Sequence, residues 1–153
     1  MKWFIIVYLL MIMGCSKKPT LYHGQPEGEW INRAQAGDLP TRIDGVQALG
    51  HYRDEQSISV LKHLTQDGNV GIRYYATDSL WQDTHSVALV IPVLKGVIND
   101  PLGWSYRDPL IHLLSEMAGE AQPLIGDLQT AMENAPNSRK AKWQECIDAI
   151  PKG

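Results

Sequence analysis

Residues 67–80 read DGNVGIRYYATDSL, a turn followed by the start of a helix, and this stretch decides the fold. Asp, Gly and Asn are the residues that form turns and cap the first turn of a helix. After Arg73, the small residues Ala76 and Ser79 recur at a spacing that puts them on one helical stripe. Small side chains on a stripe let a neighbouring helix approach closely, so residues 67–80 predict a turn and a closely packed helix.

The same pattern recurs along the chain. Arginines in matching contexts are spaced 31, 34 and 32 residues apart, and they are Arg42, Arg73, Arg107 and Arg139. Small or apolar residues follow each of the first three at the third, sixth and seventh positions. The fourth copy is looser and fits better if Lys140 takes the place of the arginine. A period in this range is typical of repeat arrays.

A turn precedes each arginine, and another amphipathic helix precedes each turn. Two helices joined by a turn make one unit, which predicts four units. The unit boundaries fall at 29–53, 54–85, 86–118 and 119–151.

The aspartates of the turns and the arginines after them predict a structural ladder rather than a catalytic site. The aspartates are expected to accept hydrogen bonds from the free N–H groups at the start of each second helix. The arginines are expected to donate to nearby carbonyls or to the aspartate one repeat away. The ladder residues are Asp38, Arg42, Asp67, Arg73, Asp100 and Arg107.

The aspartate turn followed by Arg-x-x-Ala-x-x-Ala-Leu, best seen in residues 67–80, resembles HEAT-type repeats. The similarity is greatest to the short bacterial repeats related to phycobilin-lyase subunits. It implies an all-α fold over residues 29–153, a short α-solenoid of about four HEAT-like helix pairs. In such an array the second helices line the concave side, and extended concave surfaces bind partners.

The first fifteen residues differ from the rest of the chain. Met1 and Lys2 precede an unbroken apolar run over residues 3–13, which is too short to span a bilayer as a helix. Residues 12–15, Ile-Met-Gly-Cys, resemble the lipobox of bacterial lipoprotein signals. The resemblance implies removal of a signal peptide, residues 1–14, and acylation of Cys15 with diacylglycerol and a further chain such as palmitate. A signal anchor or a buried first helix ending in Gly-Cys is the alternative.

The residues after the lipobox predict a location and a tether. Ser16 is similar to residues that permit sorting to an outer membrane, where the protein would face the periplasm, if the host has two membranes. Residues 15–28, which contain several Pro and Gly, are expected to form a lipidated tether. Two or more acyl chains would hold the domain firmly at the membrane.

Charge and cysteine content exclude two classes of protein. The 153 residues contain 14 Lys and Arg against 17 Asp and Glu, a net charge of −3 that opposes nucleic-acid binding. Without residues 1–14, the remaining 139 residues carry a net charge of −4. Two cysteines exclude a disulfide-rich scaffold. Lipidation of Cys15 leaves Cys146, whose apolar helical spacing predicts a buried small side chain rather than a redox or intermolecular cysteine.

The sequence predicts no catalytic site, no metal and no cofactor. The five histidines include no pair at metal-binding spacing, and no nucleophile motif or phosphate-binding loop occurs. Acidic residues on the second helices predict either paired carboxylates for acid–base chemistry or a solvated face, and the pattern favours the solvated face. These residues are Asp44, Asp78, Asp108 and Glu116.

A partner-binding face is the favoured functional site. Positions two and five after each arginine are expected to point to the concave side, and they are Asp44, Gln47, Tyr75, Asp78, Pro109 and His112. Tyr and Asp together suit a peptide or a basic segment, and an ordinary wet surface is the alternative. The loop 99–107 adds Trp104 and Tyr106, of the aromatic types enriched at interfaces, unless Trp104 folds back onto the adjacent repeat.

These observations predict a non-enzymatic adaptor or scaffold of the cell envelope, anchored through Cys15 and binding an unidentified protein partner. An enzyme or enzyme accessory subunit of the bilin-lyase kind is the alternative, although likeness of fold is weak evidence for function. A nucleic-acid module such as a HEAT-like DNA-repair glycosylase is opposed by the net charge and by export.

Overall fold

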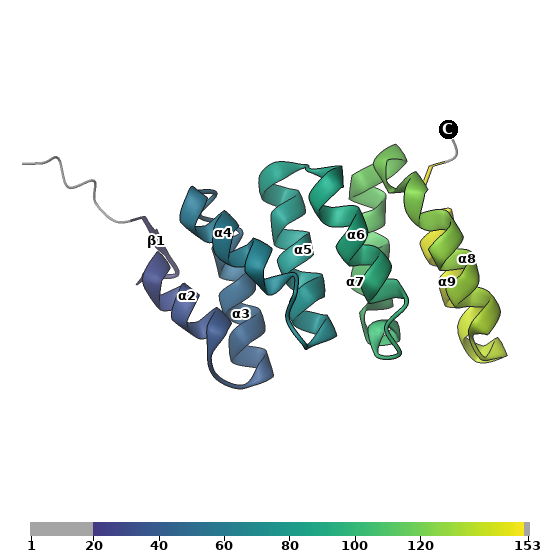
Figure 1. Cartoon of the computed structure of the whole chain (residues 1–153), viewed down its shortest axis with the longest axis horizontal. Helices are drawn as coiled ribbons and strands as arrows, with labels where there is room; N and C mark the ends of the chain where they lie inside the picture. The colour runs from purple at the N-terminus through teal and green to yellow at the C-terminus, as the bar shows by residue number, and fades with distance from the viewer. Residues whose placement is uncertain (1–19, 152–153) are drawn as a thin grey trace, which may run out of the picture.

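The computed structural model describes residues 20–151 and confirms the all-α prediction. The predicted signal peptide, Cys15 and the first part of the predicted tether lie outside the described residues. Helices α2–α9 stand side by side in a row, and a small antiparallel pair of strands lies at its N-terminal end (Figure 1).

The helices come in pairs that follow the predicted units, except that α2 begins two residues before the first unit. The first helices of the pairs are α2 (Glu27–Gln35), α4 (Glu55–Leu64), α6 (Val87–Ile98) and α8 (Ile125–Asn134). The second helices are α3 (Leu39–Leu49), α5 (Val70–Thr84), α7 (Arg107–Met117) and α9 (Asn137–Asp148). Two short 3-10 helices, η1 (Gly103–Tyr106) and η2 (Ala118–Leu124), flank α7. The turns within pairs lie along the lower edge of Figure 1 and the connections between pairs along its upper edge.

The fold begins earlier than the expected boundary at residue 29. Strands β1 (Leu21–Tyr22) and β2 (Gln25–Pro26) and the start of α2 occupy part of the range expected as tether. The Tyr52 hydroxyl accepts from the Tyr22 N–H at 3.2 Å and donates to the Gln25 carbonyl at 2.8 Å. The Trp30 indole N–H donates to the Tyr22 carbonyl at 3.1 Å. These long-range bonds order a segment whose composition alone is typical of a linker.

The helix caps confirm one of the three expected aspartates and correct two. Asp38 caps α3 by accepting from the Thr41 N–H at 3.0 Å. Asn69, not Asp67, caps α5, and Asp67 accepts from the Asn69 N–H at 2.8 Å. Asp100 accepts from the Leu102 N–H at 2.8 Å, well before α7 begins. The second and third turns are longer than the first, so their aspartates bond within the turn instead of at the helix start.

Glycine in α3 allows the closest helix contact of the first pair. A Cβ atom placed on Gly45 would lie 2.4 Å from the Ala34 nitrogen of α2, far inside contact distance. Arg42 strengthens the same contact by donating from Nε to the Ala34 carbonyl at 3.0 Å. The small-residue stripe after each arginine therefore has the predicted packing role here.

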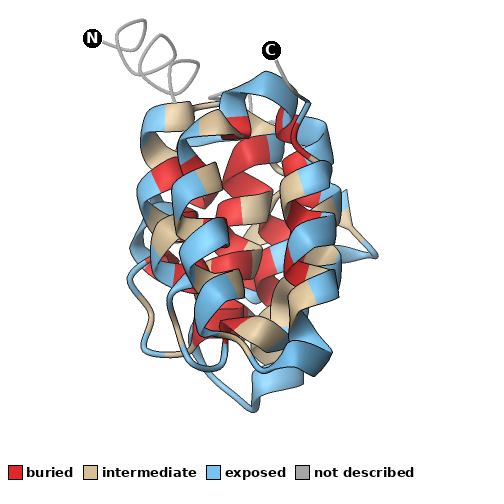
Figure 2. Cartoon of the chain, turned by 90° about the vertical axis from the view of Figure 1, so that its right-hand side faces the viewer, coloured by how far each residue is buried: buried red, intermediate tan, exposed pale blue. Residues whose placement is uncertain are grey.

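The core consists of two clusters that run along the row. The first joins the pairs α2–α3 and α4–α5 around Leu49, Leu61 and Leu80. The second extends from α5 to α9 around residues such as Leu94 and Leu114. Viewed along the row, the buried segments lie between the helices and their outer faces are exposed (Figure 2). Stacking of neighbouring pairs thus buries apolar surface that no single pair can bury alone.

Cys146 of α9 is fully buried in the second cluster, as its spacing predicted. Burial raises the pKa of its thiol to about 12. Among residues 20–151, no helix combines the length and the apolar character that crossing a membrane requires.

Candidate binding surface

The structure forms two rungs of the predicted Asp–Arg ladder. Arg42 of α3 donates to the Asp67 carboxylate in the next turn at 2.5 Å. Arg73 of α5 donates to the Asp100 carboxylate at 2.6 Å and to the Asp67 carbonyl at 2.9 Å. Each of these arginines thus ties its own unit to the turn of the following unit.

Both rung carboxylates are held in their charged form. Burial of Asp67 opposes ionisation, but bonds from the Arg42 guanidinium and the Asn69 N–H keep its pKa below the usual range. The N–H of Leu102 has the largest effect on Asp100 and lowers its pKa, burial opposes this, and the Arg73 guanidinium lowers the pKa further. The ladder therefore has a structural role, and its charges are satisfied within the chain.

The third arginine does not continue the ladder. The turn after α8, residues 134–137, contains no acidic residue, so Arg107 has no aspartate to bind there. Arg107 instead donates to the Trp104 carbonyl at 3.2 Å and pairs with Asp108 at 3.3 Å. Its guanidinium lies over the Trp104 ring, 4.4 Å from the ring centre. An aromatic stack replaces the ion pair at the junction of the last two units.

The predicted polar positions come together on a surface that we call the second-helix face. It consists of polar side chains of α3, α5 and α7 together with His51, which lies just after α3, namely Asp44, Gln47, His51, Asp78, Gln82, His112 and Glu116. Gln82 donates to the Glu116 carboxylate at 2.5 Å, and His112 Nδ1 lies 3.6 Å from the same carboxylate. The first contact joins α5 to α7, and the second lies within α7.

Asp78 lies half-buried near the centre of this face. Burial and the nearby Glu116 charge raise the pKa of Asp78 to about 6, and His112 opposes the shift. Asp78 forms no ion pair with a Lys or Arg among residues 20–151. Asp78 is therefore a carboxylate without a Lys or Arg partner, and the basic groups near it are His112, beside Glu116, and Arg53, which lines the same hollow.

Two hollows beside α3 extend the face toward the N-terminal end. One, of about 330 Å³, is lined from α3 and α5 by residues that include Gln47, His51, Asp78 and Gln82. The other, of about 260 Å³, includes Asp44, Tyr22 and Trp30, and it shares Gln47 with the first. The shared side chain makes the two hollows neighbours on one surface.

The sequence reasoning missed one row of this face. His51, Gln82 and Glu116 each lie nine positions after their arginine, one helical turn beyond the predicted fifth position. Residues four apart on a helix share a face, so the spacing contained the signal. On sequence alone, Glu116 counts only as an acid and His51 only as one of the histidines weighed for metal binding, not as members of a row.

A buried carboxylate lies behind the first hollow. The Asp83 side chain is fully buried, and neither of its oxygens has a hydrogen-bond partner among the described residues. Arg53, which lines the hollow, places its Nε 3.7 Å from Asp83 Oδ1. Burial raises the pKa of Asp83 to about 6, with Arg53 acting in the opposite direction.

The three predicted aromatic anchors make contacts inside the chain. Tyr75 is half-buried and packs edge-on against Tyr74 and Tyr106, with ring centres 5.1 and 6.1 Å apart. Tyr106 also stacks on Tyr74 at 5.8 Å and covers Gly71, where a Cβ would lie 2.6 Å from its ring. Trp104 turns the other way and meets Trp143 of α9 at 5.6 Å. The loop before α7 therefore bridges the second and fourth units.

The structure brings together only two of the four acidic residues considered for acid–base chemistry. Of the four acidic residues considered, Asp78 and Glu116 are neighbours, Asp108 pairs with Arg107, and Asp44 lines the other hollow. No group of His, Cys, Asp and Glu within residues 20–151 has the geometry to hold a metal ion.

In comparisons with known proteins, no family model, curated protein or solved structure matches this chain. The geometry of the second-helix face is therefore the basis for a functional proposal.

Proposed function

We propose that the chain is a lipid-anchored adaptor of the cell envelope that binds a basic segment of a protein partner on its second-helix face. The observation that carries the proposal is the pair formed by Asp78 and Glu116. Asp78 has a raised pKa because it is half-buried beside another carboxylate. A Lys or Arg from a partner would relieve that repulsion, so binding is favoured by charge complementarity.

The HEAT-like repeat is part of the same proposal. Repeated helix pairs, small-residue stripes and two Arg–Asp rungs between successive units support it. Repeat arrays of this kind present extended surfaces that bind other proteins. The second helices would form the concave side of the array.

Site-specific photo-crosslinking in cell envelopes tests the binding face. A photoreactive residue at Gln47 or Gln82 is expected to crosslink a discrete partner, and one at Gln129 of α8, exposed on a first helix, is not. The combined substitutions Asp78→Asn and Glu116→Gln should abolish the crosslink at Gln47. Crosslinks that survive both substitutions, or that form equally at Gln129, would contradict the proposal.

The anchor is supported by residues 1–15, where an apolar run ends in Gly-Cys. Replacement of Cys15 by Ser should release the protein from the membrane fraction, because acyl chains supply the hold. A Cys15→Ser protein that pellets with membranes as before would refute lipid anchoring without touching the partner-binding proposal.

The same carboxylates support a second candidate, an enzyme or enzyme accessory subunit of the envelope. A carboxylate with its pKa near 6 beside another one is the arrangement that acid–base catalysis uses. Hydrolase activity or a co-purifying pigment that is lost in Asp78→Asn would favour this candidate over the adaptor.

A further inference from the structure

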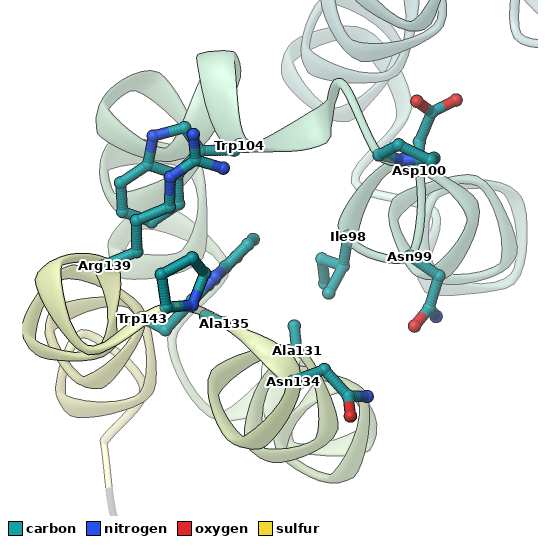
Figure 3. A pocket seen from close by; sticks show the side chains of 11 residues that line it. Ile98, Asn99, Asp100, Trp104, Ala131, Asn134, Ala135, Arg139 and Trp143 are labelled. Atoms are coloured by element: carbon teal, nitrogen blue, oxygen red, sulfur yellow. The ribbon is translucent and has the colours of Figure 1, made fainter.

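A cleft lies at the junction of the third and fourth units, where no third Arg–Asp ion pair of the ladder forms. It measures about 230 Å³ and opens between the turn after α6 and the turn after α8 (Figure 3). Trp104, Arg139 and Trp143 form one side of it, and Ile98 and Ala131 lie across from them. The cleft thus combines aromatic and aliphatic walls with a cationic side chain at its rim.

The cleft exists because the fourth turn departs from the repeat. At the two preceding junctions the corresponding turn carries an aspartate, Asp67 or Asp100, whose carboxylate binds the arginine of the preceding unit. Asn134, Ala135 and Pro136 stand here instead, and none of them carries a charge. A carboxylate that the repeat supplies elsewhere is therefore missing at the last junction.

Positive charge remains at this junction without an acidic partner from the chain. Arg139 is exposed, and its guanidinium lies over the Trp104 ring at 5.0 Å. Its backbone N–H donates to the Pro136 carbonyl at 2.8 Å, but its side chain makes no hydrogen bond or ion pair with residues 20–151. Asp100 also lines the cleft, but its two carboxylate oxygens already accept from Arg73 and from the Leu102 N–H. Asp100 therefore leaves the charge of Arg139 uncompensated.

The remaining polar group of the opposite wall is also engaged. The Asn99 amide donates to the Lys95 carbonyl and to Asp127, at 2.9 and 3.1 Å. The cleft volume is below the about 300–1,000 Å³ that small-molecule sites have, and it suits one anchoring side chain with its neighbour. A carboxylate joined to an apolar group matches both the charge and the walls.

We infer that this cleft binds an acidic side chain of an extended segment of a protein partner. The carboxylate pairs with Arg139, and the apolar residue next to it packs on Trp104 and Trp143. The inference rests on the proposed adaptor function for its choice of a protein partner. The cleft and the second-helix face take segments of opposite charge, so a partner would be held in one orientation.

The test uses two capped peptides, Ala-Pro-Glu-Leu-Ala and the same peptide with Gln in place of Glu. Binding to the protein is followed by two-dimensional NMR, reading the indole N–H signals of Trp104 and Trp143. The Glu peptide should shift both signals saturably and bind about tenfold more tightly than the Gln peptide, because a charge-assisted bond is lost in the latter.

Two arginine variants distinguish binding of the peptide in the cleft from a general effect of lowering the positive charge of the protein. Arg139→Gln should reduce the affinity for the Glu peptide about tenfold, to that for the Gln peptide. Arg33→Gln is the matched control, because Arg33 also lies over a tryptophan, 4.7 Å from the Trp30 ring. This control should leave binding unchanged.

Equal binding of the two peptides, an unaffected Arg139→Gln variant, or no shift of the two indole signals would overturn the inference. The variant with Asp78→Asn and Glu116→Gln keeps the failures apart. It should bind the Glu peptide normally, because neither residue lines the cleft. Its crosslink at Gln47 should be lost if the adaptor proposal is right and should survive if that proposal is wrong, and either result leaves the test of the cleft intact.

Discussion

Alanine at Gly45 probes the packing of α2 on α3 more sharply than any other single change. The added Cβ would lie 2.4 Å from the Ala34 nitrogen, 2.8 Å from its Cα and 2.9 Å from the Arg33 carbonyl carbon. Ordinary carbon contacts need about 3.5–4.0 Å. All three atoms belong to the backbone of α2, so no side-chain rotation relieves the clash and the helix itself must move.

The expected cost is the balance of three effects. Overpacking of this kind destabilises by about 1–3 kcal/mol. Movement of α2 also weakens the bond from Arg42 to the Ala34 carbonyl, which adds about 1 kcal/mol. The better helix propensity of alanine returns about 1 kcal/mol. We therefore expect Gly45→Ala to lower the free energy of unfolding by about 2 kcal/mol.

Gly96→Ala is the matched control, because Gly96 is exposed in α6 and an added Cβ meets nothing within 4 Å. It should raise the free energy of unfolding by about 0.5–1 kcal/mol. Urea unfolding followed by far-ultraviolet circular dichroism measures both variants. A Gly45→Ala protein as stable as the parent would refute the close approach of the two helices. Equal destabilisation at Gly96 would show that the effect is not local.

Three further predictions follow from the same structure. A double-mutant cycle with Arg73→Ala and Asp100→Ala should give a coupling of about 1–2 kcal/mol, because the pair is largely buried and charge-assisted; additive effects would show that the rung contributes nothing. Burial raises the pKa of Asp83 in the folded state to about 6. Above that pH the ionised side chain destabilises the fold. As the pH falls toward the lower pKa that Asp83 has in the unfolded chain, this destabilisation disappears. Asp83→Asn should therefore raise the free energy of unfolding at pH 7 by about 1–3 kcal/mol, and its stability should increase less than that of the parent as the pH is lowered from 7 to 4. An unchanged urea midpoint at pH 7 would contradict this. Cys146 should react with a thiol reagent at pH 8 at least about tenfold more slowly in the native protein than in urea, because the buried thiol stays protonated, and equal rates would argue against burial.

Local pattern was enough to predict the helices and their pairing. The turn and stripe of residues 67–80, repeated at a nearly constant interval, predicted the helix pairs, although α2 begins two residues before its unit. The apolar spacing around Cys146 predicted its burial. The rungs from Arg42 and Arg73 were also foreseen, because a periodic charge meets its periodic partner in any stacked array. These features depend on spacing along the chain, which the sequence contains directly.

The tertiary structure decided what lies between the units. Asn69 rather than Asp67 caps α5, because the length of the turn determines which side chain reaches the free N–H groups. Trp104 and Tyr106 turn in opposite directions, because each fills a space left by a different neighbouring unit.

The end of the ladder at Arg107 and the cleft beside Trp104 also depend partly on the sequence and partly on the tertiary structure. The sequence by itself determined that the turn at residues 134–137 lacks an acid. Only packing decided that the two neighbouring arginines would lie over one indole ring and leave Arg139 exposed at the rim of a cavity. Spacing along the chain determines which residues share a helix face, whereas contacts across units depend on how side-chain volumes fill the space between helices.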